Sequence, residues 1–220
     1  MEGPTATVIG ATGLIGNQLV ELLENDDFFK KIRVVARRQV DFNNPSIDIR
    51  VINFSDESAF RTAISGSDAV FCAVGTTNRK VNGDKDAYRN VDYDIPVNAA
   101  KYCKETGIQK FLLVSSVGAN SKSNNFYLRF KGEVEDNIRK LNLNSVTVFR
   151  PSMLLGDREE FRAGELLGKA LAVPMSIFLP SNYRPIHARN VAKAMIRASK
   201  KTDKGFKIYQ YKDMMELVKE

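Results

Sequence analysis

The chain of 220 residues contains no tryptophan, one histidine and two cysteines. Zinc sites in proteins use three or four ligands taken mostly from histidine and cysteine, so we expect no protein-built metal site. Cys72 and Cys103 are far apart in the sequence, do not form a disulfide framework, and are typical of a reducing compartment. A Ser-His-Asp hydrolase would have to rely on His187 alone.

Long apolar runs are also absent. The apolar stretches are short, for example 69–74, whereas a membrane helix needs roughly 18 residues. Residues 1–5 lack the basic region followed by an apolar stretch that marks a signal peptide. We therefore expect no membrane partner and a cytoplasmic location.

Positive charge is in excess, with 33 lysines and arginines against 26 acidic residues and a net charge of +7. Such an excess suits nucleic acid, an acidic membrane surface or an anionic small molecule. No basic stretch is interleaved with aromatic residues that could stack on bases, so we expect no nucleic-acid partner. Hydrophobic residues make up 43% of the chain and charged residues 27%, which is typical of a globular protein.

Short β-branched apolar runs alternate with longer amphipathic segments along the chain. Strands that are apolar throughout and separated by helices indicate a parallel sheet covered on both faces. We predict an α/β fold, a doubly wound parallel sheet (Rossmann fold), as a single domain over 1–220. Residues 152–186 are expected to form a small substrate-covering lobe. The predicted strands are 6–9, 32–36, 49–54, 69–74, 111–115, 146–149 and 206–209, and the predicted helices are 14–24, 57–64, 87–105, 126–141, 159–171 and 188–200.

Three glycines occupy the turn between the first predicted strand and the first predicted helix. Gly10 permits a tight turn, Gly13 lets the backbone approach a pyrophosphate, and Gly16 allows close packing of helix on strand. The helix N-terminus then offers unpaired N–H groups and the positive end of its dipole to phosphates. This placement favours a dinucleotide site over the alternative of three glycines in an ordinary turn.

The end of the second predicted strand indicates which dinucleotide is bound. An acidic residue there would hold a ribose 2′-hydroxyl, whereas arginine receives a 2′-phosphate. Arg37 and Arg38 stand at this place, with no acidic residue before Asp41. They favour NADP(H); the alternative is a solvated basic strand end. Two later turns also face the predicted cofactor: Asn53 and Phe54 beside the adenine, and Val74, Gly75 and Thr76 where the chain passes close to it.

A tyrosine and a lysine stand one helical turn apart. Tyr127 and Lys131 project from the same helix face, and an adjacent ammonium stabilises a phenolate and lowers the pKa of the tyrosine. Ser115 or Ser116, of which we favour Ser116, supplies a hydroxyl for a substrate carbonyl. This trio suits hydride transfer between a nicotinamide and a carbonyl. The alternative is a surface lysine beside a half-buried tyrosine. Glu135 is expected on a solvated helix face, or paired with Lys131.

Six segments together carry a resemblance to a known family. They are GATGLIG (10–16), VVARR (34–38), CAVGTT (72–77), LVSSVGA (113–119), NNFYLRFKGEVE (124–135) and FRPSMLLGDREEFRAGE (149–165). Over nearly its whole length the chain resembles a short-chain dehydrogenase/reductase of the atypical, extended-like kind. Within that superfamily it is most similar to the Tat-interacting, oxidoreductase-like proteins, for which the last two segments are distinctive.

The resemblance implies roles for individual residues. Tyr127 would be the proton donor or acceptor, with Lys131 as its partner. Extended members carry a stretch similar to the one that begins at His187, and it docks a helix against the sheet, which implies a structural role for this histidine. The cofactor would be contacted by Thr12, Gly13, Leu14 and Ile15 at the pyrophosphate, Arg37 and Arg38 at the 2′-phosphate, Val74 and Gly75 at the adenosine, Pro151 to Leu154 at the nicotinamide, and Arg162.

Two functions from different classes follow. The first is an NADP(H)-dependent oxidoreductase that acts on a small carbonyl or alcohol, with Tyr127 as acid and base. The second is an NADPH-sensing protein of the same fold that regulates a protein partner with little or no turnover. The intact pair of Tyr127 and Lys131, which a sensor need not keep, favours the enzyme.

Overall fold

A parallel seven-stranded sheet forms the centre of the molecule. The computed structural model describes residues 3–76, 84–156 and 180–220. The strands of the sheet are β1 (Thr5–Ile9), β2 (Lys31–Ala36), β3 (Asp48–Val51), β4 (Ala69–Cys72), β5 (Lys110–Val114), β6 (Ser145–Phe149) and β9 (Gly205–Tyr209). They lie in the order β3-β2-β1-β4-β5-β6-β9, and every neighbouring pair is parallel. The predicted doubly wound α/β fold is confirmed.

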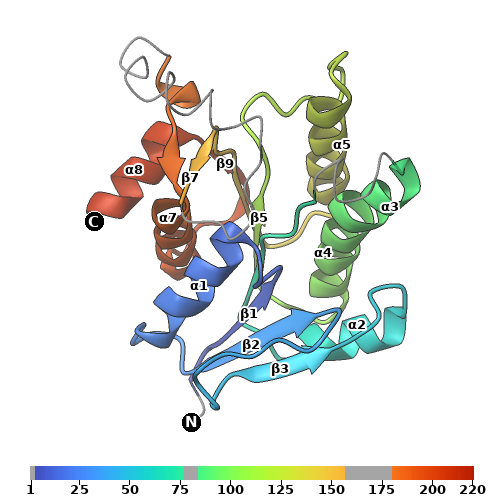
Figure 1. Cartoon of the computed structure of the whole chain (residues 1–220), viewed down its shortest axis with the longest axis vertical. Helices are drawn as coiled ribbons and strands as arrows, with labels where there is room; N and C mark the ends of the chain where they lie inside the picture. The colour runs from blue at the N-terminus through green and yellow to red at the C-terminus, as the bar shows by residue number, and fades with distance from the viewer. Residues whose placement is uncertain (1–2, 77–83, 157–179) are drawn as a thin grey trace.

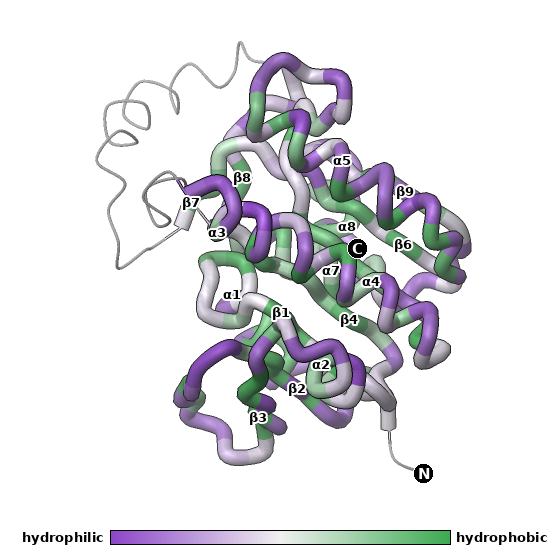
Figure 2. The backbone as a smooth tube through the Cα atoms, turned by 90° about the vertical axis from the view of Figure 1, so that its right-hand side faces the viewer, coloured by the Kyte–Doolittle hydropathy of each residue, from purple (hydrophilic) through white to green (hydrophobic). Residues whose placement is uncertain are grey.

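Helices cover both faces of this sheet (Figure 1). One face carries α1 (Leu14–Glu24), α7 (Ala188–Lys200) and α8 (Tyr211–Lys219), and the other carries α2 (Glu57–Ile64), α4 (Ile95–Glu105) and α5 (Phe126–Lys140). Because both faces are covered, β1 and β4 are buried at every residue, which explains their uninterrupted apolar sequence. Figure 2 shows the same division, with hydrophobic residues along β4 and hydrophilic turns along α5.

The strand order reverses between β1 and β4. The chain passes from β1 to β2 and β3 on one side, and then crosses to β4, β5 and β6 on the other. Ligands of open parallel sheets bind beyond the carboxyl ends of the strands at such a point. The two strand ends are joined there, because the N–H of Ala73 donates to the carbonyl of Ile9 at 2.9 Å. The glycine turn and the segment after β4 therefore lie side by side at the carboxyl end of the sheet.

The helix predicted over 87–105 is divided into three segments. α3 (Lys85–Arg89) and α4 flank a π-helical stretch, η1 (Asn90–Asp94). Pro96 explains the division, because it has no N–H to donate to the carbonyl of Asp92, four residues before it, as a continuous α-helix would require. The wider π turn accommodates the missing hydrogen bond at Pro96 and changes which side chains of this segment face inward.

The C-terminal third also differs from the prediction. The two ends of the expected lobe form a small parallel sheet of β7 (Leu154–Leu155) and β8 (Ile186–His187), with the short 3₁₀ helix η3 (Ser181–Tyr183) before β8. The predicted helix at 159–171 lies outside the described residues. α8 was not predicted; Met214 and Leu217, three positions apart, bury its inner face against the core shared with α7.

Candidate active site

The glycine turn brings the start of α1 against the end of β4. Gly10 has a positive φ of 90°, and a Cβ there would lie 2.8 Å from the backbone of Ala73. A Cβ on Gly16 would lie 2.0 Å from the carbonyl oxygen of Gly10, so neither position accepts a side chain without a backbone shift. Gly13 caps α1 with no side-chain hydrogen bond, and the first turn of this helix has no acidic residue. Its N–H groups are therefore available to an anion.

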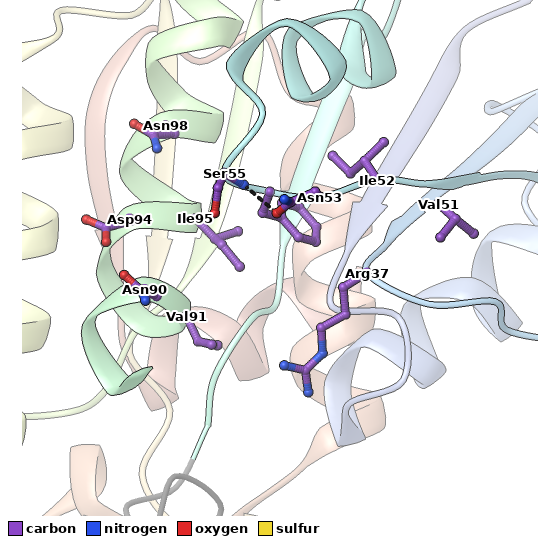
Figure 3. A pocket seen from close by; sticks show the side chains of 11 residues that line it. Arg37, Val51, Ile52, Asn53, Ser55, Asn90, Val91, Asp94, Ile95 and Asn98 are labelled. Atoms are coloured by element: carbon purple, nitrogen blue, oxygen red, sulfur yellow. Dashed lines mark hydrogen bonds between the residues drawn. The ribbon is translucent and has the colours of Figure 1, made fainter. Parts of the chain in front are cut away.

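A cavity of about 640 Å³ lies between the ends of β2 and β3 on one side and η1 and the start of α4 on the other. Three predicted residues, Arg37, Asn53 and Phe54, line it. Figure 3 shows Arg37 and Asn53 on one side and a row of polar side chains from the helix on the other. The complete lining is Arg37, Val51, Ile52, Asn53, Phe54, Ser55, Asn90, Val91, Asp94, Ile95 and Asn98.

The helix side of the cavity was missed by sequence reasoning. Asn90, Asp94 and Asn98 recur every four residues after β4, and this polar stripe on an otherwise amphipathic helix was the available signal. Arg37 and Arg38 are both exposed, but Arg38 does not line the cavity. Within the described residues, neither arginine has a hydrogen-bonded or ion-paired partner, so both remain available to a ligand.

A buried ion pair joins α5 to η1. The ammonium of Lys131 lies 2.8 Å from Oδ1 of Asp92, and these residues are only 6% and 1% exposed. Oδ2 of Asp92 accepts the backbone N–H of Thr76 at 2.7 Å. Burial favours the neutral amine, but the Asp92 carboxylate, assisted by Tyr127, outweighs it, so the pKa of the Lys131 ammonium is raised above its usual value. Sequence reasoning did not identify Asp92.

Tyr127 stands in the first turn of α5. Asn125 caps this helix by accepting the N–H of Leu128 at 3.2 Å, which sets where the helix begins and hence where Tyr127 projects. The tyrosine is 41% exposed, and the centroid of its ring is 6.0 Å from Nζ of Lys131. The two residues thus lie together as the spacing predicts, with the tyrosine open to solvent and the lysine buried beneath it.

The two serines after β5 have different surroundings. The hydroxyl of Ser115 is buried and donates to Glu135, whose carboxylate is also bound by Nε of Arg150 at 3.0 Å. Ser116 is half-buried, and its hydroxyl has one long hydrogen bond, of 3.3 Å, to the carbonyl of Val117. Ser115 is therefore engaged in a structural network, and the hydroxyl of Ser116 is the freer of the two.

Two expectations about Glu135 are wrong. Its side chain is buried rather than solvated, and its partner is Arg150 rather than Lys131. The inward face of α5 explains this outcome, because Lys131, Val134 and Glu135 are all buried there. The positive charge of Lys131 is instead balanced by the carboxylate of Asp92 on η1.

The remaining predicted residues lie around the same edge of the sheet. The carbonyl of Pro151 accepts the N–H of Val117 at 2.9 Å, and Leu154 is half-buried in β7. The side chain of Leu14 lies 3.0 Å from the place of a Cβ on Gly156, which brings the start of α1 next to the segment after Pro151. Thr12 and Ile15 belong to the glycine turn and the first turn of α1. Arg162 lies outside the described residues.

The histidine and the two cysteines do not line the cavity. His187 is exposed and caps α7 without a side-chain hydrogen bond. Cys72 and Cys103 are both fully buried; burial raises the pKa of both thiols, that of Cys72 to about 12. Within residues 3–76, 84–156 and 180–220, no three His, Cys, Asp or Glu residues are arranged to hold a metal. In these same ranges, no helix is long and apolar enough to cross a membrane.

The fold and these residues define a dinucleotide-binding α/β protein. Residues 10–202 match the family described as NAD(P)H-binding, and the chain belongs to this family. It is 35% identical over 207 residues to "Protein FMP52, mitochondrial" of Candida albicans, covering 90% of this chain and 89% of that protein. It is 34% identical over 172 residues to "Protein HTATIP2" of Rattus norvegicus, covering 77% and 70%. The resemblance to the Tat-interacting group is confirmed.

Solved structures show the same fold at low identity. A UDP-N-acetylglucosamine 4-epimerase from Methanobrevibacter ruminantium superposes with a TM-score of 0.70 at 18% identity, covering 96% of this chain and 77% of the epimerase. MoeE5 in complex with UDP-glucuronic acid and NAD superposes with a TM-score of 0.72 at 16% identity, covering 93% and 75%. These similarities establish the fold of dinucleotide-dependent epimerases and dehydrogenases.

The expected cytoplasmic location is contradicted. Relatives from Candida albicans, Scheffersomyces stipitis and Meyerozyma guilliermondii, at 33–35% identity, are named as mitochondrial proteins. The expectation rested on the composition of residues 1–5 and on the short apolar runs, and neither feature distinguishes the cytoplasm from an organelle.

Proposed function

We propose that this protein is an NADP(H)-dependent oxidoreductase that acts on a small carbonyl or alcohol. The observation that carries the proposal is the pair of Tyr127 and Lys131 on α5, one turn apart, at the same edge of the sheet as the glycine turn and the cavity lined by Arg37. A dinucleotide bound at this edge and an acid–base group on α5 are what such a reaction requires, which supports the proposal.

Each residue has a stated role in the proposed reaction. NADPH, when bound, supplies the hydride. Tyr127 donates its hydroxyl proton to the carbonyl oxygen in reduction and takes a proton from the alcohol in oxidation. Ser116 donates a hydrogen bond to the same oxygen. Lys131 binds the nicotinamide ribose through N–H groups that are not used by Asp92. The first-turn N–H groups of α1 bind the pyrophosphate.

The proposed preference for NADPH over NADH rests on the two exposed arginines. Arg37→Ala, alone and with Arg38→Ala, is expected to weaken NADPH binding by about 10- to 100-fold, because a charge-assisted contact to the 2′-phosphate is lost. NADH binding is expected to change little. Titration of both nucleotides by fluorescence measures the ratio. Arg139→Ala is the matched control. Arg139 lies in the last turn of α5, at the opposite end of the helix from Tyr127, and its guanidinium lies over the ring of Phe206. An unchanged ratio in the double variant would remove both arginines from cofactor selection.

The enzyme itself is tested on a panel of small aldehydes, ketones and alcohols, with nucleotide absorbance as the readout. We expect turnover with NADPH or NADP and weaker turnover with NADH or NAD. If neither nucleotide binds at up to millimolar concentration, the proposal is wrong. If NADPH binds without turnover on the panel, and capture of a protein partner follows the nucleotide, the protein is a sensor of the same fold.

A further inference from the structure

We propose that Asp92 is a positioning residue of this site, whose buried carboxylate holds the Lys131 ammonium in place and ties it to the backbone segment after β4. The part of this inference that concerns catalysis rests on the proposed function. The contacts of Asp92 do not depend on that function, and the experiment below tests the contacts and the catalytic effect separately.

The carboxylate of Asp92 is engaged at both oxygens. Oδ1 binds Lys131 at 2.8 Å and Oδ2 binds the N–H of Thr76 at 2.7 Å. Asp92 is 1% exposed, so these two contacts replace the water that a carboxylate would otherwise keep. One side chain therefore connects three segments: α5, which carries Tyr127 and Lys131, η1, and the turn after β4 that was predicted to pass close to the cofactor.

Lys131 depends on this carboxylate for its charge. The titratable groups that face its amine are Asp92 on η1, Tyr127 on α5 and Cys72 at the end of β4. Burial raises the pKa of the Cys72 thiol, which keeps it neutral, and Asp92 is the one carboxylate paired with Lys131 in the described part of the chain. Burial without a counter-ion lowers the pKa of an ammonium, so the counter-charge that holds the proton on Lys131 has to come from Asp92.

The π segment explains how an acidic residue reaches this place. Asn90, Val91 and Asp94 of η1 line the cavity that Arg37 also lines, whereas Asp92 turns into the protein toward Lys131. Because π segments arise where a helix accommodates a local irregularity, they are frequent at functional sites. The same five residues thus contribute one wall of the cavity and the anchor of the lysine.

The pairing leaves Lys131 equipped for its proposed work. An ammonium has three N–H donors, and one is used by Asp92, so two remain for a nucleotide hydroxyl and for Tyr127. Asp92 does not itself touch the substrate. Its effect on the reaction passes through the position and the charge of the lysine.

Asp92→Asn tests the inference, since it keeps the shape and an acceptor for Thr76 while removing the charge. The protein is labelled with lysine carrying ¹³C at Cε, and the Lys131 signal is assigned by its absence in Lys131→Arg. In the unaltered protein we expect this signal to titrate above about 10.4, the ordinary lysine value. In Asp92→Asn we expect the midpoint to fall by about one to three pH units.

The control is Asp203→Asn, which removes the carboxylate of an exposed pair, Asp203 and Lys207 at 2.9 Å. It is expected to leave the Lys131 titration and the turnover unchanged. An unshifted Lys131 midpoint in Asp92→Asn overturns the inference. If Asp92→Asn does not fold, the Lys131 titration in the unaltered protein tests the inference. A Lys131 midpoint below about 10.4 there would also overturn the inference.

A second measurement connects Asp92 to the reaction. In alcohol oxidation, the limb of the kcat profile that reports loss of the Tyr127 proton is expected to move to higher pH in Asp92→Asn, because a neutral lysine stabilises the phenolate less. If the Lys131 midpoint falls but the unaltered protein turns over no substrate, the hold of Asp92 on the lysine stands and the oxidoreductase assignment fails. If turnover is present and its profile does not move, Asp92 has no part in catalysis.

Discussion

Tyr127→Phe is expected to lower kcat for carbonyl reduction by about 10²- to 10⁴-fold, the range that general acid–base catalysis contributes. The variant keeps the aromatic ring and loses only the hydroxyl, so the proton that must reach the carbonyl oxygen has no donor. The dissociation constant for NADPH is expected to stay within about threefold, because the glycine turn and the arginines, which are proposed to bind the phosphates, are untouched. Steady-state kinetics and a binding titration on the same preparation measure both quantities.

The matched control is Tyr211→Phe. Tyr211 begins α8 and packs partly buried against the core on the other face of the sheet, so loss of its hydroxyl should leave kcat unchanged. Full turnover in Tyr127→Phe would exclude this tyrosine as the acid–base group. If the variant loses both NADPH binding and turnover, the tyrosine has a structural role instead.

Glu135→Gln is expected to lower the free energy of unfolding by about 3 kcal/mol, because breaking a buried ion pair leaves the other charge uncompensated. Glu135 accepts from Ser115 and Arg150, and its side chain is 3% exposed against 19% for the arginine. For a chain of this length, the loss corresponds to a fall of about 6 to 12 °C in Tm. Urea unfolding followed by circular dichroism measures the change.

Glu133→Gln is the internal control for this prediction. Glu133 lies two residues earlier on α5, is 40% exposed, and pairs with Arg129 at 3.9 Å, so its loss is expected to cost less than about 1 kcal/mol. A second comparison separates charge from packing: Glu135→Leu with Arg150→Leu should cost less than Glu135→Leu alone. Equal losses in Glu133→Gln and Glu135→Gln would show that the buried pair contributes no more than the exposed one.

Local patterns explain why much of the fold could be predicted. The helices at 14–24, 57–64 and 188–200 have the predicted bounds, because amphipathic spacing and end signals such as the Asp56 cap act within a few residues. The parallel sheet follows from strands that are apolar on both faces. The glycine turn was predictable for the same reason, since its sequence lies wholly between one strand and one helix.

Pairings between distant residues could not be predicted in this way. Asp92 and Lys131 are 39 positions apart, and Glu135 pairs with Arg150, the residue that follows β6. In the sequence, both acidic residues have the pattern of solvated helix faces. Their burial depends on how η1 and α5 pack against β4 and β5, and that packing is not encoded in any short window.

By itself, then, the sequence determined the doubly wound sheet, the glycine turn, the basic end of β2 and the spacing of Tyr127 and Lys131. Only the tertiary structure decided which arginine lines the cavity, which serine is free, and which carboxylate holds the lysine. The physical reason is that backbone conformation and amphipathicity are set by near neighbours, whereas the environment of a charge is set by every element that excludes water from it.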